Sequence, residues 1–141
     1  MYRRIVCLLI IVILNSMVLQ AQEFIPLWPA GKMPNTKGMR LKDSIYNERV
    51  YQVGTPGMYA FFPSVQENKQ CAVLICPGGG YHHLSYQISG FQLAKWFNTM
   101  GISAFVLNYR LPISPDLVQR EKGPLQDAQR ALGLMRQNAE A

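Results

Sequence analysis

Three consecutive glycines, Gly78 to Gly80, lie between Pro77 and Tyr81 at the end of a continuous apolar run. Glycine loses more conformational freedom on folding than any other residue, so such a run indicates a backbone that takes unusual angles or approaches a ligand closely. Two chemistries use a loop of this kind. Its N–H groups can bind nucleotide phosphates, or they can stabilise the negative oxygen that forms during acyl transfer. A plain tight turn is the alternative without a ligand.

The nucleotide interpretation is not supported by the surrounding residues. The dinucleotide pattern G-x-G-x-x-G requires a third glycine at position 83, which is His83, and an acidic residue after the following strand, where the sequence has Asn108. The phosphate-loop pattern that ends in Gly-Lys-Ser/Thr is also absent. The glycine run therefore favours an oxyanion-binding loop.

The elements next to this loop are expected to form a β-α-β unit. Cys71–Cys76 is a continuous apolar run, which is typical of a strand covered on both faces. A helix is expected from about Gly90 to Met100, followed by a second strand over Ile102–Leu107 that runs parallel to the first. The apolar face of the helix is expected to contain four residues at helical spacing: Leu93, Trp96, Phe97 and Met100.

Further elements are expected on either side of this unit. The β-prone runs Val50–Val53 and Met58–Phe62 predict an antiparallel hairpin. A second helix is expected to start at Pro124, where the missing N–H costs nothing. Five residues are expected to form its buried face: Leu125, Ala128, Leu132, Met135 and Ala139.

The first 21 residues resemble a secretory signal peptide. Arg3 and Arg4 precede the apolar run Ile5–Leu14, and a more polar stretch leads to the small residue Ala21, after which cleavage is expected. A membrane anchor is the alternative, but the apolar run is shorter than the roughly 20 residues that span a bilayer. We expect a secreted or periplasmic protein without stable membrane association. Residues 22–47 are expected to form an irregular leader, and residues 48–141 the folded domain.

Charge and cysteine content bear on two further questions, whether the protein binds nucleic acid and whether it contains a disulfide. The formal net charge is +6, but the basic residues are scattered, so the composition does not predict a nucleic-acid partner. Cys71 and Cys76 would lie roughly 16 Å apart in one strand, at about 3.3 Å per residue. A disulfide needs Cα atoms within about 7 Å, so the two are not expected to pair. Both are expected to be buried apolar residues.

Four segments of the sequence resemble the α/β-hydrolase superfamily, in its esterase and lipase branch. Ile75–Tyr81 is similar to the oxyanion loop of that family, with Pro77 in the place of the histidine of His-Gly-Gly-Gly. Gly101–Pro112 resembles the next strand and its Tyr-Arg-Leu-Pro exit, and Leu125–Ala131 resembles the helix before the nucleophile. Leu27–Gly31 resembles the leader of secreted bacterial members that act on acetylated or feruloylated plant polysaccharides.

This resemblance implies roles for the residues of the loop. Gly79 and Gly80 would donate their backbone N–H groups to the oxyanion, and Gly78 would let the loop bend. Tyr81 would flank the acyl pocket, and His82 would shape the substrate side of the site mouth. In this family a further N–H donor comes from the residue after the nucleophile.

The nucleophile itself is missing from the sequence. The family places it in G-x-S-x-G, on the turn after the next strand. Ser103 follows Gly101 at the right spacing but lacks the closing glycine and lies at a strand start, whereas Ser89 has no glycine before it. The acid and the base are missing as well.

Three other side chains could be mistaken for triad members. His82 and His83 are possible bases, but the family order of serine, acid and histidine places its catalytic histidine far downstream. Asp127 precedes any nucleophile, so we expect a structural role in which it caps its helix and pairs with Arg110. No cofactor or metal is expected, because only the adjacent His82 and His83 approach ligand spacing.

The sequence therefore predicts an incomplete α/β-hydrolase fold, in which a hairpin precedes a parallel β-α-β-α segment and the sheet ends before the nucleophile strand. The expected function is that of the N-terminal fragment of a secreted serine carboxylic-ester hydrolase. Its substrate would be the acetyl or feruloyl esters of plant cell-wall polysaccharide, and the fragment alone would be inactive. The alternatives are a non-catalytic secreted half-domain that binds carbohydrate or a partner, and a lipase or peptidase of the same fold.

The coding sequence after codon 141 tests the expectation of a fragment. We expect the reading frame to continue into an apolar strand and a G-x-S-x-G motif within roughly 25 residues. Sequencing of the gene across this point provides the measurement. A genuine stop codon there would favour the non-catalytic binding protein instead.

Overall fold

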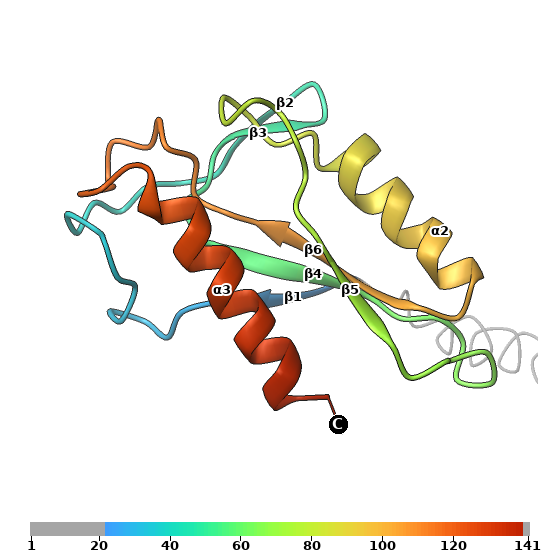
Figure 1. Cartoon of the computed structure of the whole chain (residues 1–141). Coiled ribbons are helices and arrows are strands. Elements are labelled where there is room, and N and C mark those ends of the chain that lie inside the picture. The colour runs from blue at the N-terminus through green and yellow to red at the C-terminus, as the bar shows by residue number, and fades with distance from the viewer. Residues whose placement is uncertain (1–21, 140–141) are drawn as a thin grey trace, which may run out of the picture.

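The computed structural model describes residues 22–139, so the expected signal peptide lies outside the described residues. Within this range the chain is a mixed α/β structure with a four-stranded sheet, a two-stranded sheet, and helices packed on the larger sheet. Figure 1 shows α3 lying across one face of the larger sheet. None of the helices among residues 22–139 is both long and apolar enough to cross a membrane.

The larger sheet combines antiparallel and parallel pairing. Its strands lie in the order β1 (Glu23–Pro26), β4 (Gly57–Phe61), β6 (Ser103–Asn108) and β5 (Ala72–Ile75). β4 pairs antiparallel with both β1 and β6, whereas β5 and β6 are parallel. The predicted parallel pairing of the two strands that flank the first helix is therefore confirmed.

The predicted hairpin is wrong. β3 (Arg49–Gln52) pairs with β2 (Ser44–Tyr46) in the small sheet, while β4 belongs to the larger one. The connection between β3 and β4 is held by the leader instead. Gly54 N–H donates to the Asp43 carboxylate at 2.6 Å, and the Pro56 carbonyl accepts from Leu27 N–H at 3.0 Å. The leader, expected to be irregular, also contains β1 and β2.

The first helix turns a different face to the sheet than predicted. It consists of a π-helical turn, η1 (Gln87–Gln92), followed by α2 (Leu93–Thr99). Its buried residues are Gly90, Phe91 and Ala94. Of the predicted face, Phe97 is partly buried and packs on the core as expected, whereas Trp96 is 55% exposed. Small residues allow the close approach, since a Cβ on Gly90 would lie only 2.7 Å from Val106 Cγ1.

The second helix, α3 (Lys122–Gln137), begins slightly before Pro124 and also differs in its buried face. Gly123, Asp127 and Ala131 are buried, whereas Leu125 is 57% exposed. Ala128 and Met135 are partly buried as expected and pack on the core around Leu107. The neighbouring Val106 packs with α2 residues, so the two helices cover opposite faces of the sheet.

β5 is less covered than predicted. Because it lies at the edge of the sheet, Ala72 is exposed and only Ile75 of this strand is buried. The flanking Cys71 and Cys76 are free thiols, as expected, but both are exposed, so the prediction of buried cysteines is wrong.

A buried ion pair joins α3 to the end of β6, as the sequence led us to expect. Arg110 and Asp127 are 2% and 0% exposed, and Arg110 Nη2 lies 2.8 Å from Asp127 Oδ1. Arg110 Nε and the Arg110 backbone N–H also donate to the carboxylate, at 3.0 and 2.9 Å. Asp127 lies beyond the first turn of α3, and no side-chain hydrogen bond caps that helix, so its expected capping role is wrong.

The same ion pair holds the leader. Trp28 Nε1 donates to Asp127 at 2.9 Å, and Arg110 Nη1 donates to the Pro34 carbonyl at 2.7 Å. Arg130, one turn further along α3, donates to the Leu27 carbonyl at 2.9 Å and lies over the Trp28 ring. The buried Asp127 carboxylate therefore accepts hydrogen bonds both from the leader, through Trp28, and from Arg110 just after β6.

A second buried carboxylate, Asp116, fastens the following part of the leader. It accepts hydrogen bonds from Thr36 Oγ1 at 2.6 Å and from the backbone N–H groups of Met39 and Lys37 at 2.8 and 3.1 Å. Burial acts to raise the pKa of Asp116, but these hydrogen bonds and the nearby Arg110 outweigh burial and lower it. The leader is thus tied to the domain at two charged side chains.

We expect Asp127→Asn to lower the free energy of unfolding by about 3–5 kcal/mol, because it leaves the buried Arg110 guanidinium without its counter-charge. A double-mutant cycle with Arg110→Met, followed by urea denaturation, provides the measurement. The two single losses should add up to clearly more than the loss in the double variant. Arg136→Ala, at an exposed position of α3, is the control and should change stability by no more than about 0.5 kcal/mol. Additive losses would contradict a coupled pair.

Candidate functional site: the glycine loop

The glycine loop, Pro77–Tyr81, follows β5 at the edge where the parallel strands β5 and β6 both end. Gly79, Gly80 and Tyr81 have positive φ angles of 149°, 62° and 59°. Glycine accepts such angles readily, whereas tyrosine does so at a conformational cost. Gly79 also has no room for a side chain, because a Cβ there would overlap the His83 carbonyl oxygen.

The first three carbonyl groups of the loop each accept a hydrogen bond from the protein. The Pro77 carbonyl accepts from the Tyr109 hydroxyl at 2.8 Å, and the Gly78 carbonyl accepts from Ser85 N–H at 2.9 Å. The Gly79 carbonyl accepts from His82 N–H at 3.1 Å. Three successive peptide planes are therefore fixed by their oxygen atoms.

The orientation of the carbonyls sets that of the N–H groups. In a trans peptide the C=O and the next N–H point in opposite directions, and the described residues contain no cis peptide. The N–H groups of Gly79 and Gly80 thus point away from the groups that bind the preceding carbonyls. Among residues 22–139, no hydrogen bond uses either N–H as donor. Free N–H groups of successive residues can bind an anion or a developing negative oxygen.

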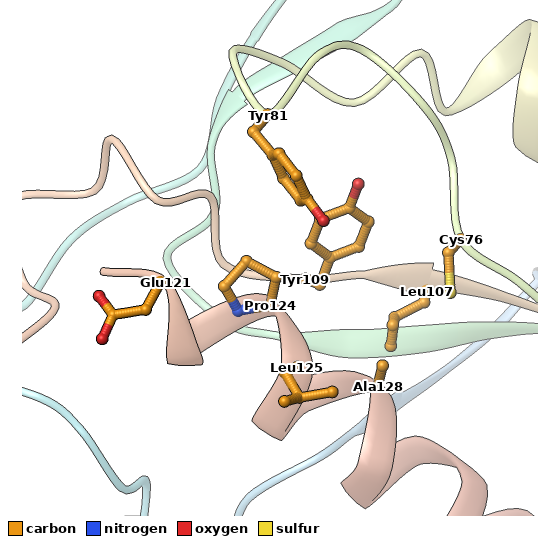
Figure 2. Close-up of a pocket in the computed structure, with 8 residues that line it drawn as sticks. All are labelled: Cys76, Tyr81, Leu107, Tyr109, Glu121, Pro124, Leu125 and Ala128. Atoms are coloured by element: carbon orange, nitrogen blue, oxygen red, sulfur yellow. The ribbon is translucent and has the colours of Figure 1, made fainter. Parts of the chain in front are cut away.

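A pocket of about 240 Å³ lies between this loop and the start of α3. Figure 2 shows Tyr81 from the loop and Tyr109 from the end of β6 on one side of it, and α3 on the other. Burial, helped by the nearby Cys76 and Tyr81, raises the pKa of Tyr109 to about 12. Although Cys76 is an exposed residue, partial desolvation of its side chain raises the pKa of the thiol. The remaining lining residues are Leu107, Glu121, Pro124, Leu125 and Ala128.

The two histidines lie on the other side of the loop. The rings of His82 and His83 contact the Tyr51 ring of β3, with ring centres 5.9 and 5.6 Å apart. Two backbone hydrogen bonds join β3 of the small sheet to the residue after His83. Val50 N–H donates to the Leu84 carbonyl at 3.0 Å, and Leu84 N–H donates to the Val50 carbonyl at 2.8 Å. His82 is exposed, and its role at a site mouth stays a prediction.

The structure therefore brings Gly78, Gly79, Gly80, Tyr81 and His82 together in one loop, and their functional roles stay predictions. Sequence reasoning missed Tyr109, which anchors the loop, and Tyr51, which contacts the histidines. In the sequence, Tyr109 stands out only as part of the Tyr-Arg-Leu-Pro exit. Tyr109 directly follows β6, and the loop follows β5. Because the carboxyl ends of parallel strands lie at the same edge of a sheet, this position indicates that Tyr109 lies near the loop. Among residues 22–139 no cluster of three or more potential metal ligands occurs.

Comparison with known proteins adds the chemical context. No family model matches the chain. An acetylxylan esterase of Xylanibacter ruminicola is 34% identical over 86 residues, which cover 61% of this chain and 16% of that protein. The endo-1,4-beta-xylanase B of Butyrivibrio fibrisolvens is 31% identical over 112 residues, which cover 76% of this chain and 17% of that protein. The chain thus spans only a small part of the curated relatives it matches.

A solved structure is similar as well. The crystal structure of an acetyl ester-xyloside bifunctional hydrolase from Caldicellulosiruptor lactoaceticus matches with a TM-score of 0.53 and 29% sequence identity. The match covers 89% of this chain and 39% of that one. Together these similarities relate the chain to hydrolases, and more closely to proteins of the carbohydrate-esterase kind.

We expect Gly79→Ala to lower the free energy of unfolding by about 1–3 kcal/mol, because alanine disfavours the positive φ and its Cβ would overlap the His83 carbonyl. Gly78→Ala is the matched control, since Gly78 has neither a positive φ nor an atom within 4 Å of an added Cβ. It should change stability by no more than about 0.5 kcal/mol. Urea denaturation followed by circular dichroism provides both values. Equal losses in the two variants would show that the loop does not adopt this conformation.

Proposed function

We propose that this chain is the N-terminal part of a serine carboxylic-ester hydrolase of the α/β-hydrolase superfamily. The observation that carries this proposal is the orientation of the glycine loop. Hydrogen bonds fix the carbonyls of Pro77, Gly78 and Gly79 and leave the N–H groups of Gly79 and Gly80 free. Free N–H groups on a rigid loop are the feature that acyl transfer requires for its negative intermediate.

The arrangement of the sheet supports the expected place of the missing nucleophile. β5 is an edge strand of the sheet, and the glycine loop follows its carboxyl end. A further strand paired in parallel with β5 would end beside this loop, because parallel strands have their carboxyl ends at the same edge. A G-x-S-x-G turn after such a strand would place its serine close to Gly79 and Gly80.

In the proposed reaction this serine attacks the ester carbonyl while a histidine, oriented by an acid, takes its proton. The carbonyl oxygen becomes negative and accepts hydrogen bonds from the N–H groups of Gly79 and Gly80. The alcohol leaves with a proton from the histidine, and water then releases the acyl group. Loss of one such donor typically raises the barrier by about 3 kcal/mol. The nucleophile, acid and base would come from residues beyond this sequence.

The proposed substrate is an acyl ester on plant cell-wall polysaccharide. Two of the similar proteins are named for acetyl esters, an acetylxylan esterase and an acetyl ester-xyloside hydrolase. These names favour an acetyl group over the feruloyl group that the sequence resemblance also allows. Tyr81 would flank the acyl group, and His82 would lie toward the sugar. The basic, apolar and small-residue order of residues 3–21 supports a secreted or periplasmic location.

Hydrolysis of 4-nitrophenyl acetate tests this proposal. We expect no turnover above the buffer rate by the 141-residue chain, because it lacks the nucleophile. The chain extended through the downstream G-x-S-x-G should hydrolyse this ester and release acetate from acetylated xylan. Replacement of that serine by alanine is the control and should abolish both activities.

Two results would contradict the proposal. Turnover by the 141-residue chain would show that its own residues supply a nucleophile. An extended chain that binds xylan without hydrolysing either ester would favour a non-catalytic binding protein.

A further inference from the structure

Tyr109 links the end of β6 to the start of the glycine loop. It directly follows β6, is 8% exposed, and its hydroxyl donates a buried 2.8 Å hydrogen bond to the Pro77 carbonyl. A carbonyl oxygen can only accept, so the phenol must be protonated for this bond to exist. Burial raises the pKa of Tyr109 to about 12, so the phenol keeps its proton at neutral pH.

Within the described part of the chain, the other hydrogen bonds of the loop do not reach the larger sheet. The Gly78 and Gly79 carbonyls accept from the N–H groups of Ser85, His82 and His83, which belong to the same segment of the chain and move with the loop. The bond pair at Leu84 attaches this segment to the small sheet, which is separate from the sheet that contains β5 and β6. Tyr109 instead extends from the larger sheet.

The loop needs such an anchor because its conformation is not the intrinsic preference of its residues. Gly79, Gly80 and Tyr81 all have positive φ angles. This conformation is energetically unfavourable for Tyr81, because Tyr81 carries a side chain. The bond to Pro77 also fixes the first of three successive peptide planes, and the next two planes carry the N–H groups of Gly79 and Gly80. A small rotation at Pro77 would displace the Gly79 and Gly80 N–H groups together.

We propose that Tyr109 is a positioning residue, whose hydroxyl ties the glycine loop to the end of β6 and so holds the N–H groups of Gly79 and Gly80 in the orientation that binds the oxyanion. This inference rests on the proposed function for its chemistry, but the positioning itself can be measured without ester hydrolysis. The proposed role acts through the loop, by way of the hydrogen bond to the Pro77 carbonyl, and requires no contact of Tyr109 with the reacting atoms.

Nuclear magnetic resonance of the 141-residue chain labelled with ¹⁵N-glycine tests this proposal. Tyr109→Phe removes only the hydroxyl, and Tyr59→Phe is the matched control, because Tyr59 is also partly buried with a raised pKa. Tyr59 packs against Phe91 on the opposite face of the sheet. The heteronuclear NOE of Gly79 and Gly80 reports how rigid the loop is, and the change of their chemical shifts on addition of sodium acetate reports anion binding. In a second, uniformly labelled sample, the hydrogen-exchange rate of Ser85 N–H reports the stability of its bond to the Gly78 carbonyl.

In Tyr109→Phe we expect lower NOE values for Gly79 and Gly80, weaker shift changes with acetate, and about fivefold faster exchange of Ser85 N–H, as the loss of one net hydrogen bond implies. Distant glycines such as Gly133 should keep their shifts, and Tyr59→Phe should behave as the unsubstituted chain. Unchanged NOE values and exchange in Tyr109→Phe would overturn the positioning role. If these change while acetate leaves Gly79 and Gly80 unperturbed in the unsubstituted chain, the positioning role stands and the oxyanion function is contradicted.

Discussion

The buried pair of Arg110 and Asp127 is the interaction on which the arrangement of this domain depends. It joins the end of β6 to the middle of α3, and through Trp28 and Pro34 it also holds the leader. An unpaired charge at this depth would cost several kcal/mol, so each of these segments is constrained to supply its part of the network. Arg110 directly follows Tyr109 in the chain. The ion pair that fixes α3 on the sheet therefore also fixes the backbone at Tyr109, which hydrogen-bonds to the glycine loop.

Much of the site could be predicted because its signals are local in sequence. A run of three glycines after an apolar strand requires a special backbone, and the structure has positive φ angles at Gly79 and Gly80. The parallel β-α-β unit follows from chain connectivity and is confirmed, as is the pairing of Arg110 with Asp127. The glycine run and the β-α-β unit are each recognisable within one segment of the chain. The ion pair is recognisable from two residues of opposite charge.

The errors arise where the outcome depends on a distant partner. The pattern of Met58–Phe62 indicates a strand but not its neighbour, and β1 lies in a leader whose prolines indicate turns. The apolar face of α3 was assigned from Leu125 and Leu132, yet the network at Asp127 turns a polar residue and the small Gly123 and Ala131 toward the core. Tyr109 was missed as an anchor because its partner, Pro77, is 32 residues away.

We propose that this chain contributes an oxyanion-binding loop and that the nucleophile lies in a part of the protein beyond residue 141. Treatment with a fluorophosphonate probe, followed by peptide mass spectrometry, tests this claim most directly, because the probe forms a stable bond with the activated serine of a serine hydrolase. We expect no labelled residue in the 141-residue chain and a single labelled serine, within G-x-S-x-G, in the chain extended past residue 141. A labelled serine within residues 22–141 would contradict it.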